Sequence, residues 1–158
     1  MDSVFYEIPT ANNNENAENG IITGVMVCVT GQRSCERLIN RGFERTEKGQ
    51  KLFIVHCVQT GHNFMNSPFE ADAIEYLFTA ARLVGAELTI LREDDVINAL
   101  VKFANDNNVK LIVLGASPDS GTESFVNRFA MRLPEVEFDV VRTSALPYNN
   151  INKSDNKN

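Results

Sequence analysis

The chain has 158 residues and a formal net charge of −6, with 43% hydrophobic and 23% charged residues. This length fits one domain built around a single hydrophobic core. The acidic balance argues against a dedicated binder of nucleic acid or of anionic membranes, because both need a basic surface. The sequence has no apolar run of the roughly 20 residues that cross a bilayer, and its N-terminus lacks the features of a cleaved signal. We therefore expect a cytoplasmic protein.

Both ends of the chain are predicted to be disordered tails. Residues 1–21 and 146–158 are rich in asparagine and poor in apolar anchors. Such segments bury too little apolar surface to offset the conformational entropy that ordering would cost. The remaining segment, 22–145, is predicted to form one domain. An odd number of cysteines, two of them in apolar runs, favours reduced intracellular thiols over a disulfide framework; they are Cys28, Cys35 and Cys57.

Predicted strands and helices alternate along this domain. Apolar, β-branched runs predict five strands, at 24–30, 51–60, 87–92, 109–114 and 138–142. Apolar residues at helical spacing predict helices between them, at 34–50, 69–84, 96–104 and 122–133. This alternation of apolar strands with helices predicts an α/β three-layer sandwich, with a parallel sheet covered on both faces. With the first strand placed centrally, the predicted strand order is 3-2-1-4-5.

A ligand site is predicted where the strand order reverses, because open parallel sheets bind ligands there, beyond the carboxyl ends of the strands. The crevice would lie between segments 30–34 and 115–124. In the second segment an apolar run ends at a glycine, and a small polar loop leads into a helix whose N-terminus would favour a phosphate. Compact turns of a purely structural kind would have the same composition, so both interpretations remain open. The candidate contacts are Thr30, Gly31, Arg33, Gly115, Ser117, Ser120, Gly121, Thr122 and Ser124.

Other polar residues favour structural roles. Arginines recur every four positions in the first predicted helix, at 33, 37, 41 and 45, and glutamates interleave with them. This pattern indicates a solvated, salt-bridged helix face, with only Arg33 beside the crevice. The acidic run 93–95 is interpreted as helix capping rather than as a magnesium site, and no metal site is predicted. The sequence has no nucleophile elbow, Walker lysine or convincing catalytic triad, so we do not expect an enzyme.

Three segments of the chain resemble the universal stress protein family. They are Val-Met-Val-Cys-Val-Thr-Gly-Gln-Arg-Ser at 25–34, Asp-Asp-Val-Ile-Asn-Ala-Leu-Val-Lys-Phe-Ala at 94–104, and Asn-Val-Lys-Leu-Ile-Val-Leu-Gly at 108–115. The branch that they resemble most is the one found in Kdp-type potassium-sensing histidine kinases. The resemblance covers nearly all of 22–143. It implies the five-stranded, adenine nucleotide alpha hydrolase-like fold, commonly dimeric, with ATP, AMP or another adenine nucleotide in the crevice. In the kinase branch, cyclic di-AMP is a further candidate ligand.

The chain departs from the family's phosphate loop, which runs Gly-x2-Gly-x9-Gly-Ser/Thr. Gly115 matches the first glycine, Pro118 stands at the second, and the final Gly-Ser falls on Glu123-Ser124 after a shortened loop. Thr30 stands where many nucleotide-binding members have an aspartate. A phosphate would be repelled by Glu123 unless that side chain points away.

These departures leave two functions open. The first is a non-catalytic domain that senses an adenine nucleotide and signals to a protein partner, in stress or potassium regulation. The second is a dimerisation or interaction module that has lost its ligand. A slow nucleotide hydrolase is weaker, because Glu123 would be its only candidate base.

The last predicted strand indicates how copies of the chain associate. It would lie at an edge of the sheet, and an unprotected edge invites pairing with a second copy. Phe138, Val140 and Val141 are therefore expected to form the edge of a homodimer. Asp139 and Arg142 are expected to set its register by charge pairing between the copies.

Overall fold

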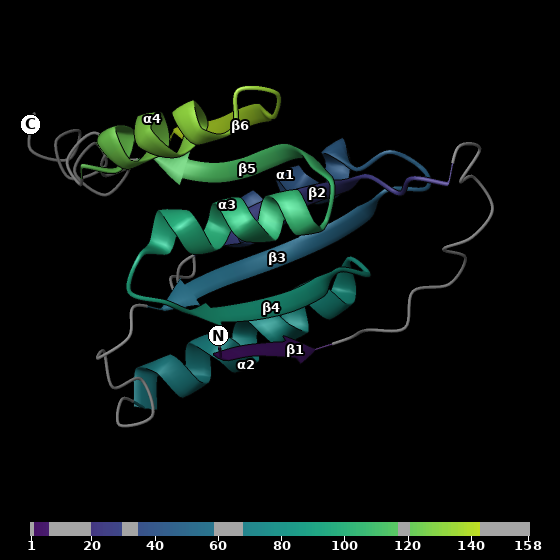
Figure 1. Ribbon diagram of the computed structural model, residues 1–158. Helices are drawn as coiled ribbons and strands as arrows, with labels where there is room; N and C mark the ends of the chain where they lie inside the picture. The colour runs from purple at the N-terminus through teal and green to yellow at the C-terminus, as the bar shows by residue number, and fades with distance from the viewer. Residues whose placement is uncertain (1, 7–19, 30–34, 59–67, 117–120, 143–158) are drawn as a thin grey trace, which may run out of the picture.

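The computed structural model describes residues 2–6, 20–29, 35–58, 68–116 and 121–142 (Figure 1). The strands are β1 (Asp2–Tyr6), β2 (Gly24–Val29), β3 (Lys51–Val58), β4 (Glu87–Arg92), β5 (Val109–Ala116) and β6 (Glu137–Arg142). The helices are α1 (Cys35–Arg45), α2 (Pro68–Leu83), α3 (Val96–Asp106) and α4 (Thr122–Arg132).

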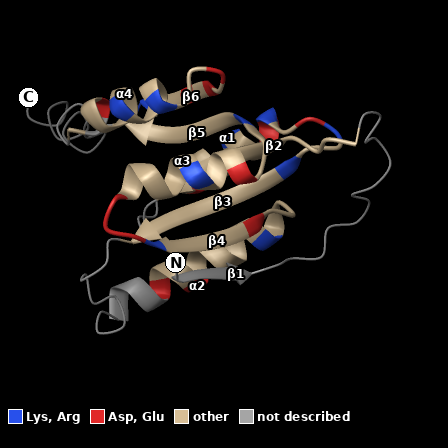
Figure 2. Ribbon diagram, viewed as in Figure 1, with Lys and Arg blue, Asp and Glu red and all other residues tan. Residues whose placement is uncertain are grey.

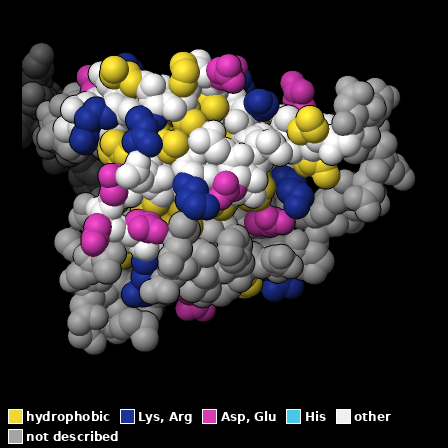
Figure 3. Space-filling view, in the orientation of Figure 1, with side chains coloured by type: hydrophobic (Ala, Val, Ile, Leu, Met, Phe, Trp, Pro, Cys, Tyr) yellow, Lys and Arg dark blue, Asp and Glu magenta, His cyan; other side chains and the backbone are white. Residues whose placement is uncertain are grey.

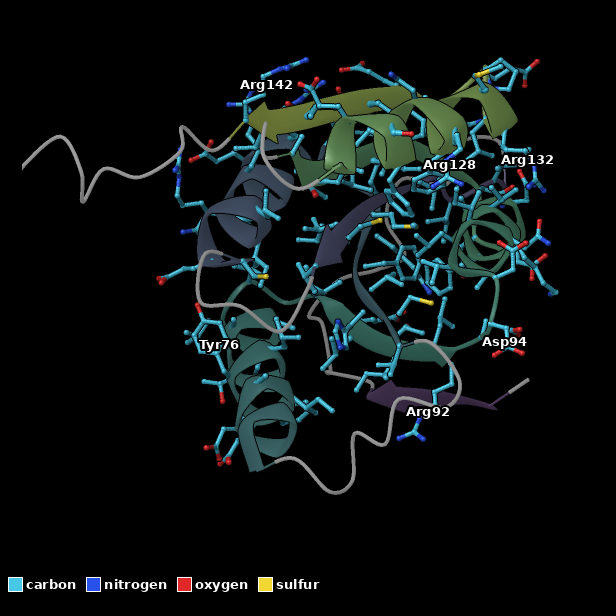
Figure 4. The ribbon with its side chains drawn as sticks, turned by 90° about the vertical axis from the view of Figure 1, so that its left-hand side faces the viewer. Tyr76, Arg92, Asp94, Arg128, Arg132 and Arg142 are labelled. Atoms are coloured by element: carbon cyan, nitrogen blue, oxygen red, sulfur yellow. The ribbon has the colours of Figure 1, made fainter. Side chains whose placement is uncertain are left out.

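The strands form one six-stranded sheet in the order β1-β4-β3-β2-β5-β6. The strands from β2 to β6 run parallel, and their order is the predicted 3-2-1-4-5. The layers are also as predicted: α1 and α2 cover one face of the sheet, and α3 and α4 cover the other (Figure 4). The fold class predicted from the alternation of strands and helices is therefore confirmed.

The N-terminal residues differ from the prediction of a disordered tail. Asp2–Tyr6 forms β1, which pairs antiparallel with β4 from Asp2 opposite Arg92 to Tyr6 opposite Leu88. Val-Phe-Tyr is a short run of residues that favour strands. It pairs with the outer edge of β4, whose backbone groups thereby gain hydrogen-bond partners. The prediction missed this run because residues 1–21 as a whole are rich in asparagine. The expectations for residues 7–19 and for the C-terminal tail fall outside the described residues.

The core is divided by the sheet into two apolar clusters. Alternate residues of each strand face opposite sides, so Val25 and Val27 of β2 pack beneath α1 while Met26 packs on the side of α3 and α4. The helix α1 lies close to β2 at Gly42, where a Cβ atom would overlap the Cγ2 methyl of Val27. This close approach fixes the position of α1 over the central strand.

Within the part of the chain that the structure describes, no helix is long and apolar enough to cross a membrane. The face seen in Figure 3 carries basic side chains scattered among acidic and uncharged ones.

Candidate functional site

The five parallel strands end at one edge of the sheet, which faces the viewer in Figure 4. The neighbouring strands β2 and β5 lead from this edge to helices on opposite faces, β2 to α1 and β5 to α4. The strand order therefore reverses between β2 and β5, and the predicted switch point lies there. We call this edge, with the first turns of the helices that follow, the carboxyl edge.

Several predicted contact residues cannot be placed. Thr30, Gly31, Arg33, Ser117 and Ser120 lie outside the described residues, and Thr122 is described only by its backbone, at the first position of α4. The described candidates are Gly115 near the end of β5, and Gly121 and Ser124 at the start of α4. These three residues lie at the end of β5 and the start of α4, which meet at the switch point.

The two described glycines differ in what the backbone requires of them. Gly121 precedes α4 in the left-handed conformation, with φ of 68°, which glycine adopts without strain. It also supplies no side-chain cap to the first turn of α4. At Gly115, by contrast, a Cβ atom would lie 3.5 Å from Leu38 Cδ1 and 3.7 Å from the Val141 carbonyl oxygen, which are ordinary contacts. The fold itself therefore demands glycine at 121 but not at 115.

Glu123 is directed toward β6. Its Oε1 accepts a hydrogen bond from Nη1 of Arg142, the last residue of that strand, and both side chains are exposed. The carboxylate of Glu123, which would repel a phosphate bound at the start of α4, is therefore paired with the guanidinium of Arg142. Within the chain, Arg142 thus has a partner at the start of α4, and its predicted pairing across a dimer stays a prediction.

The acidic residue Asp139 also has partners within the chain. It accepts hydrogen bonds from Arg41 Nε at 2.8 Å and from Arg45 Nη1 at 2.9 Å. Arg45 further contacts Glu137 at 2.5 Å. Arg41 and Arg45 of α1 thus bind the edge strand β6 rather than serving only as a solvated face.

The acidic run 93–95 contains the helix cap that was predicted there. Asp95 is the N-cap of α3, and its Oδ1 accepts a hydrogen bond from the Asn98 backbone N–H at 3.1 Å. Asp94 is exposed at the carboxyl edge (Figure 4). No group of three potential metal ligands occurs among the described residues.

A buried histidine connects the two central strands at the same edge. His56 of β3 is 8% exposed, and its Nδ1 donates a hydrogen bond to the carbonyl oxygen of Val29, the last residue of β2, at 3.0 Å. No role was predicted for His56 from the sequence. The available signal was a single polar side chain inside an apolar run, two residues before the strand ends.

The cysteines are free thiols, as predicted. Cys28 and Cys57 lie toward the carboxyl ends of β2 and β3, on the side of α3 and α4. Burial raises the pKa of both, that of Cys57 to about 11 and that of Cys28 further. Both thiols are therefore protonated at neutral pH, and neither is a ready nucleophile.

The chain is similar in structure to solved universal stress proteins. The protein from Archaeoglobus fulgidus superposes with a TM-score of 0.57 at 17% identity, covering 77% of this chain and 93% of that one. The same organism's universal stress protein in complex with dAMP gives 0.54 at 18% identity, covering 77% and 98%. A family member from Burkholderia pseudomallei gives 0.53 at 18% identity, covering 75% and 94%.

In sequence, the chain matches no family model and no curated protein. Its similarity to the solved structures spans most of both chains, at identities below one fifth. Together with the strand order and the two helical layers, this similarity shows that the chain has the fold of the universal stress proteins.

Proposed function

We propose that this chain is a non-catalytic domain that binds an adenine nucleotide at the carboxyl edge between β2 and β5. The supporting fold is that of the universal stress proteins, one of which was solved in complex with dAMP. The observation that carries the proposal is the pairing of Glu123 with Arg142. Because that carboxylate is engaged by β6, the first turn of α4 is compatible with a bound phosphate.

We further propose that nucleotide occupancy alters the affinity of the chain for a signalling partner. The resemblance to Kdp-type sensor kinases suggests stress or potassium regulation as the setting, and ATP, AMP or cyclic di-AMP as ligands. The partner and the setting are both proposed from this resemblance.

The test starts from the purified chain. Nucleotides released on denaturation are identified by mass spectrometry, and the melting temperature is measured with AMP, ATP or cyclic di-AMP. We expect a shift that Ser124→Asp abolishes, because the added carboxylate repels a phosphate while a negative charge favours the first turn of a helix. The matched control is Asn127→Asp, one turn further along α4 and also exposed. An unchanged shift in Ser124→Asp would contradict this site.

The alternative is an interaction module without a ligand, which Pro118 and Thr30 favour as departures from the family's loop. It predicts no released nucleotide and no melting shift with any of the three ligands. The same measurements therefore separate the two functions.

For either function we propose a homodimer formed through β6, at Phe138, Val140 and Val141. The supporting observation is that β6 is an edge of the sheet: it pairs with β5 on one side, and no described strand lies on its other side. Exposed edges pair readily with other strands. Sedimentation equilibrium should show a dimer, and hydrogen exchange at 137–142 should slow as the protein concentration rises. Exchange that does not depend on concentration would contradict an interface at β6.

A further inference from the structure

The outer edge of β4 receives a strand that is not part of the parallel sheet. The strand β1 pairs with it antiparallel, from Asp2 opposite Arg92 to Tyr6 opposite Leu88. It lies on the side of the sheet opposite β6 (Figure 1), and no described strand lies beyond it. A two-stranded pairing is at best marginally stable by itself, so β1 depends on the rest of the fold for its place.

The edge that receives β1 is built by other parts of the fold. All six residues of β4 pair with β3 on the inner side. The four central residues, 88–91, are buried, and Figure 2 shows that the charged residues of β4 lie at its two ends. The backbone groups on the outer side of β4 are therefore held ready for pairing, and such an edge is a template for any strand that fits its register.

The connection from β1 to β2 is much longer than the distance it covers. Tyr6 lies in one row with Leu88, Ile54 and Val27 of the three neighbouring strands. Three strand spacings across the sheet and three residues along β2 place Tyr6 about 17 Å from Gly24. The segment 7–23 that joins them has a reach of roughly 60 Å when extended. The chain's covalent path therefore permits β1 to lie on its own β4 or on the β4 of a second copy.

The pairing itself does not determine which copy supplies β1. The outer edge of β4 offers the same five positions to the first strand of its own chain and to that of a second copy. The difference is the covalent connection, because a short tether presents its strand at an effective concentration of about 1 mM. A second copy therefore competes as the protein concentration approaches that value. Reciprocal exchange between two copies restores the pairing of both and closes the assembly.

We propose that the outer edge of β4 is a strand-acceptor site, and that the segment Asp2–Tyr6 of a second copy exchanges there with the chain's own. Exchange joins copies at the side of the sheet opposite β6. This inference goes beyond the proposed function and does not depend on it, because the outer edge of β4 takes no part in the switch point between β2 and β5.

The test marks the donor and the acceptor strand in different copies. One protein carries Asp2→Cys and the other Arg92→Cys, since directly opposite residues of antiparallel strands have the separation that a disulfide needs. The two are mixed, incubated with a reductant at about 10 μM to about 1 mM, the range that brackets the effective concentration of the tether, and oxidised briefly with diamide. Mass spectrometry of the peptides then measures the disulfide between positions 2 and 92, which in this mixture forms only between copies.

Two controls accompany the mixture. Replacing the acceptor by Arg132→Cys, an exposed position at the end of α4, measures cross-linking by random collision. A single chain with both Asp2→Cys and Arg92→Cys, oxidised at low concentration, locks β1 onto its own β4. Mixed with unlocked Arg92→Cys, this locked protein has no free donor strand.

A deletion of residues 7–19 in the double-cysteine chain provides a second measurement. The four residues that remain between Tyr6 and Gly24 reach about 17 Å at full extension, no more than the distance to be covered. Pairing within the chain is then prevented, so the disulfide between positions 2 and 92 should form between copies. In the double-cysteine chain of full length it should form within the chain at low concentration.

We expect the disulfide between copies in the mixture to rise at least tenfold from about 10 μM to about 1 mM, as competition with a strand at about 1 mM predicts. The locked protein and the Arg132→Cys control should show no such rise. A yield at about 1 mM no greater than that of the collision control would overturn the proposal. If the deletion unfolds the chain, as circular dichroism would show, the mixture decides alone.

Discussion

Gly42 of α1 lies against Val27 of β2 so closely that a Cβ atom at position 42 would overlap the valine's Cγ2 methyl. A second neighbour, Leu52 Cδ1, would be 3.3 Å away. Both Val27 and Leu52 are buried. The position of the first helix over the sheet is therefore set by the absence of a side chain at this glycine.

Replacing Gly42 by alanine is expected to destabilise the chain. Alanine favours a helix by about 1 kcal/mol over glycine, but overpacking of a buried contact typically costs about 1–3 kcal/mol. We expect the overpacking to dominate and the free energy of unfolding in urea to fall. The double variant Gly42→Ala with Val27→Ala should be more stable than the sum of the two single changes predicts. Gly115→Ala is the control, because its Cβ fits at 3.5 Å from the nearest side chain. A more stable Gly42→Ala protein would contradict the close contact.

Asp139 should make stability depend on pH in the acid range. Burial opposes its ionisation, but hydrogen bonds from Arg41 and Arg45 outweigh this and lower the pKa of the carboxyl below its ordinary value. A carboxyl with a lowered folded-state pKa stabilises the fold above its unfolded pKa of about 3.9, and the contribution is lost as pH falls through the folded pKa.

The measurement compares the unmodified chain with Asp139→Asn in urea at several pH values. Asp139→Asn should be less stable near pH 7, and the difference should shrink below about pH 3.9, where the carboxyl begins to protonate in the unfolded chain. Glu137→Gln provides the control, because Glu137 is exposed and its ion pair with Arg45 should contribute less than about 1 kcal/mol. A constant difference at every pH would show that Asp139 acts through packing and not through its charge.

Cys57 should make stability fall on the alkaline side. Burial, with a contribution from Glu93, raises the pKa of its thiol to about 11. A raised folded-state pKa stabilises the fold fully below the unfolded value of about 8.5, and this contribution is lost as pH rises toward the folded value. Urea unfolding between these limits should show the loss, and Cys57→Ala should reduce it. Iodoacetamide should also modify Cys57 slowly in the native chain and rapidly in urea. Equal rates would contradict the burial.

Removing residues 1–6 should expose the edge of β4. The strand β1 supplies the antiparallel partner of that edge along five residues, and an uncovered edge strand promotes association. We expect the truncated chain to be less stable and to form assemblies larger than those of the full chain, as measured by light scattering. A shortened chain with unchanged stability and size would indicate that β1 pairs only weakly with β4.

The sequence predicted the parallel sheet well because the signal for it is local. Each apolar run and each helical repeat is contained in one segment, and the alternation then dictates parallel strands. Strand β1 was missed because its five residues were averaged with the asparagine-rich stretch that follows. The predicted edge position of the last strand, β6, is confirmed.

The interactions that were missed are those between distant residues. The arginines of α1 were expected to pair with glutamates of their own helix, but Arg41 reaches a carboxylate 98 positions away. The hydrogen bond between His56 and Val29 likewise spans 27 positions. Repeat patterns describe which face of a helix or strand is apolar, but they carry no information about which polar groups meet once the layers pack. For the same reason, topology predicts where in the fold a ligand site would lie but not which side chains would contact the ligand.

The pairing of β1 with β4 affects how many copies of the chain can associate through the edges of the sheet. A sheet with two open edges can add a neighbour on each side and grow into a filament. Here one edge is the chain's own first strand, which is only five residues long, and short edge strands limit further pairing. Two copies joined through β6 about a twofold axis would use up the other edge of each, and such an assembly is self-limiting. A growing fibre would also need copies to pair along the short edge that β1 forms.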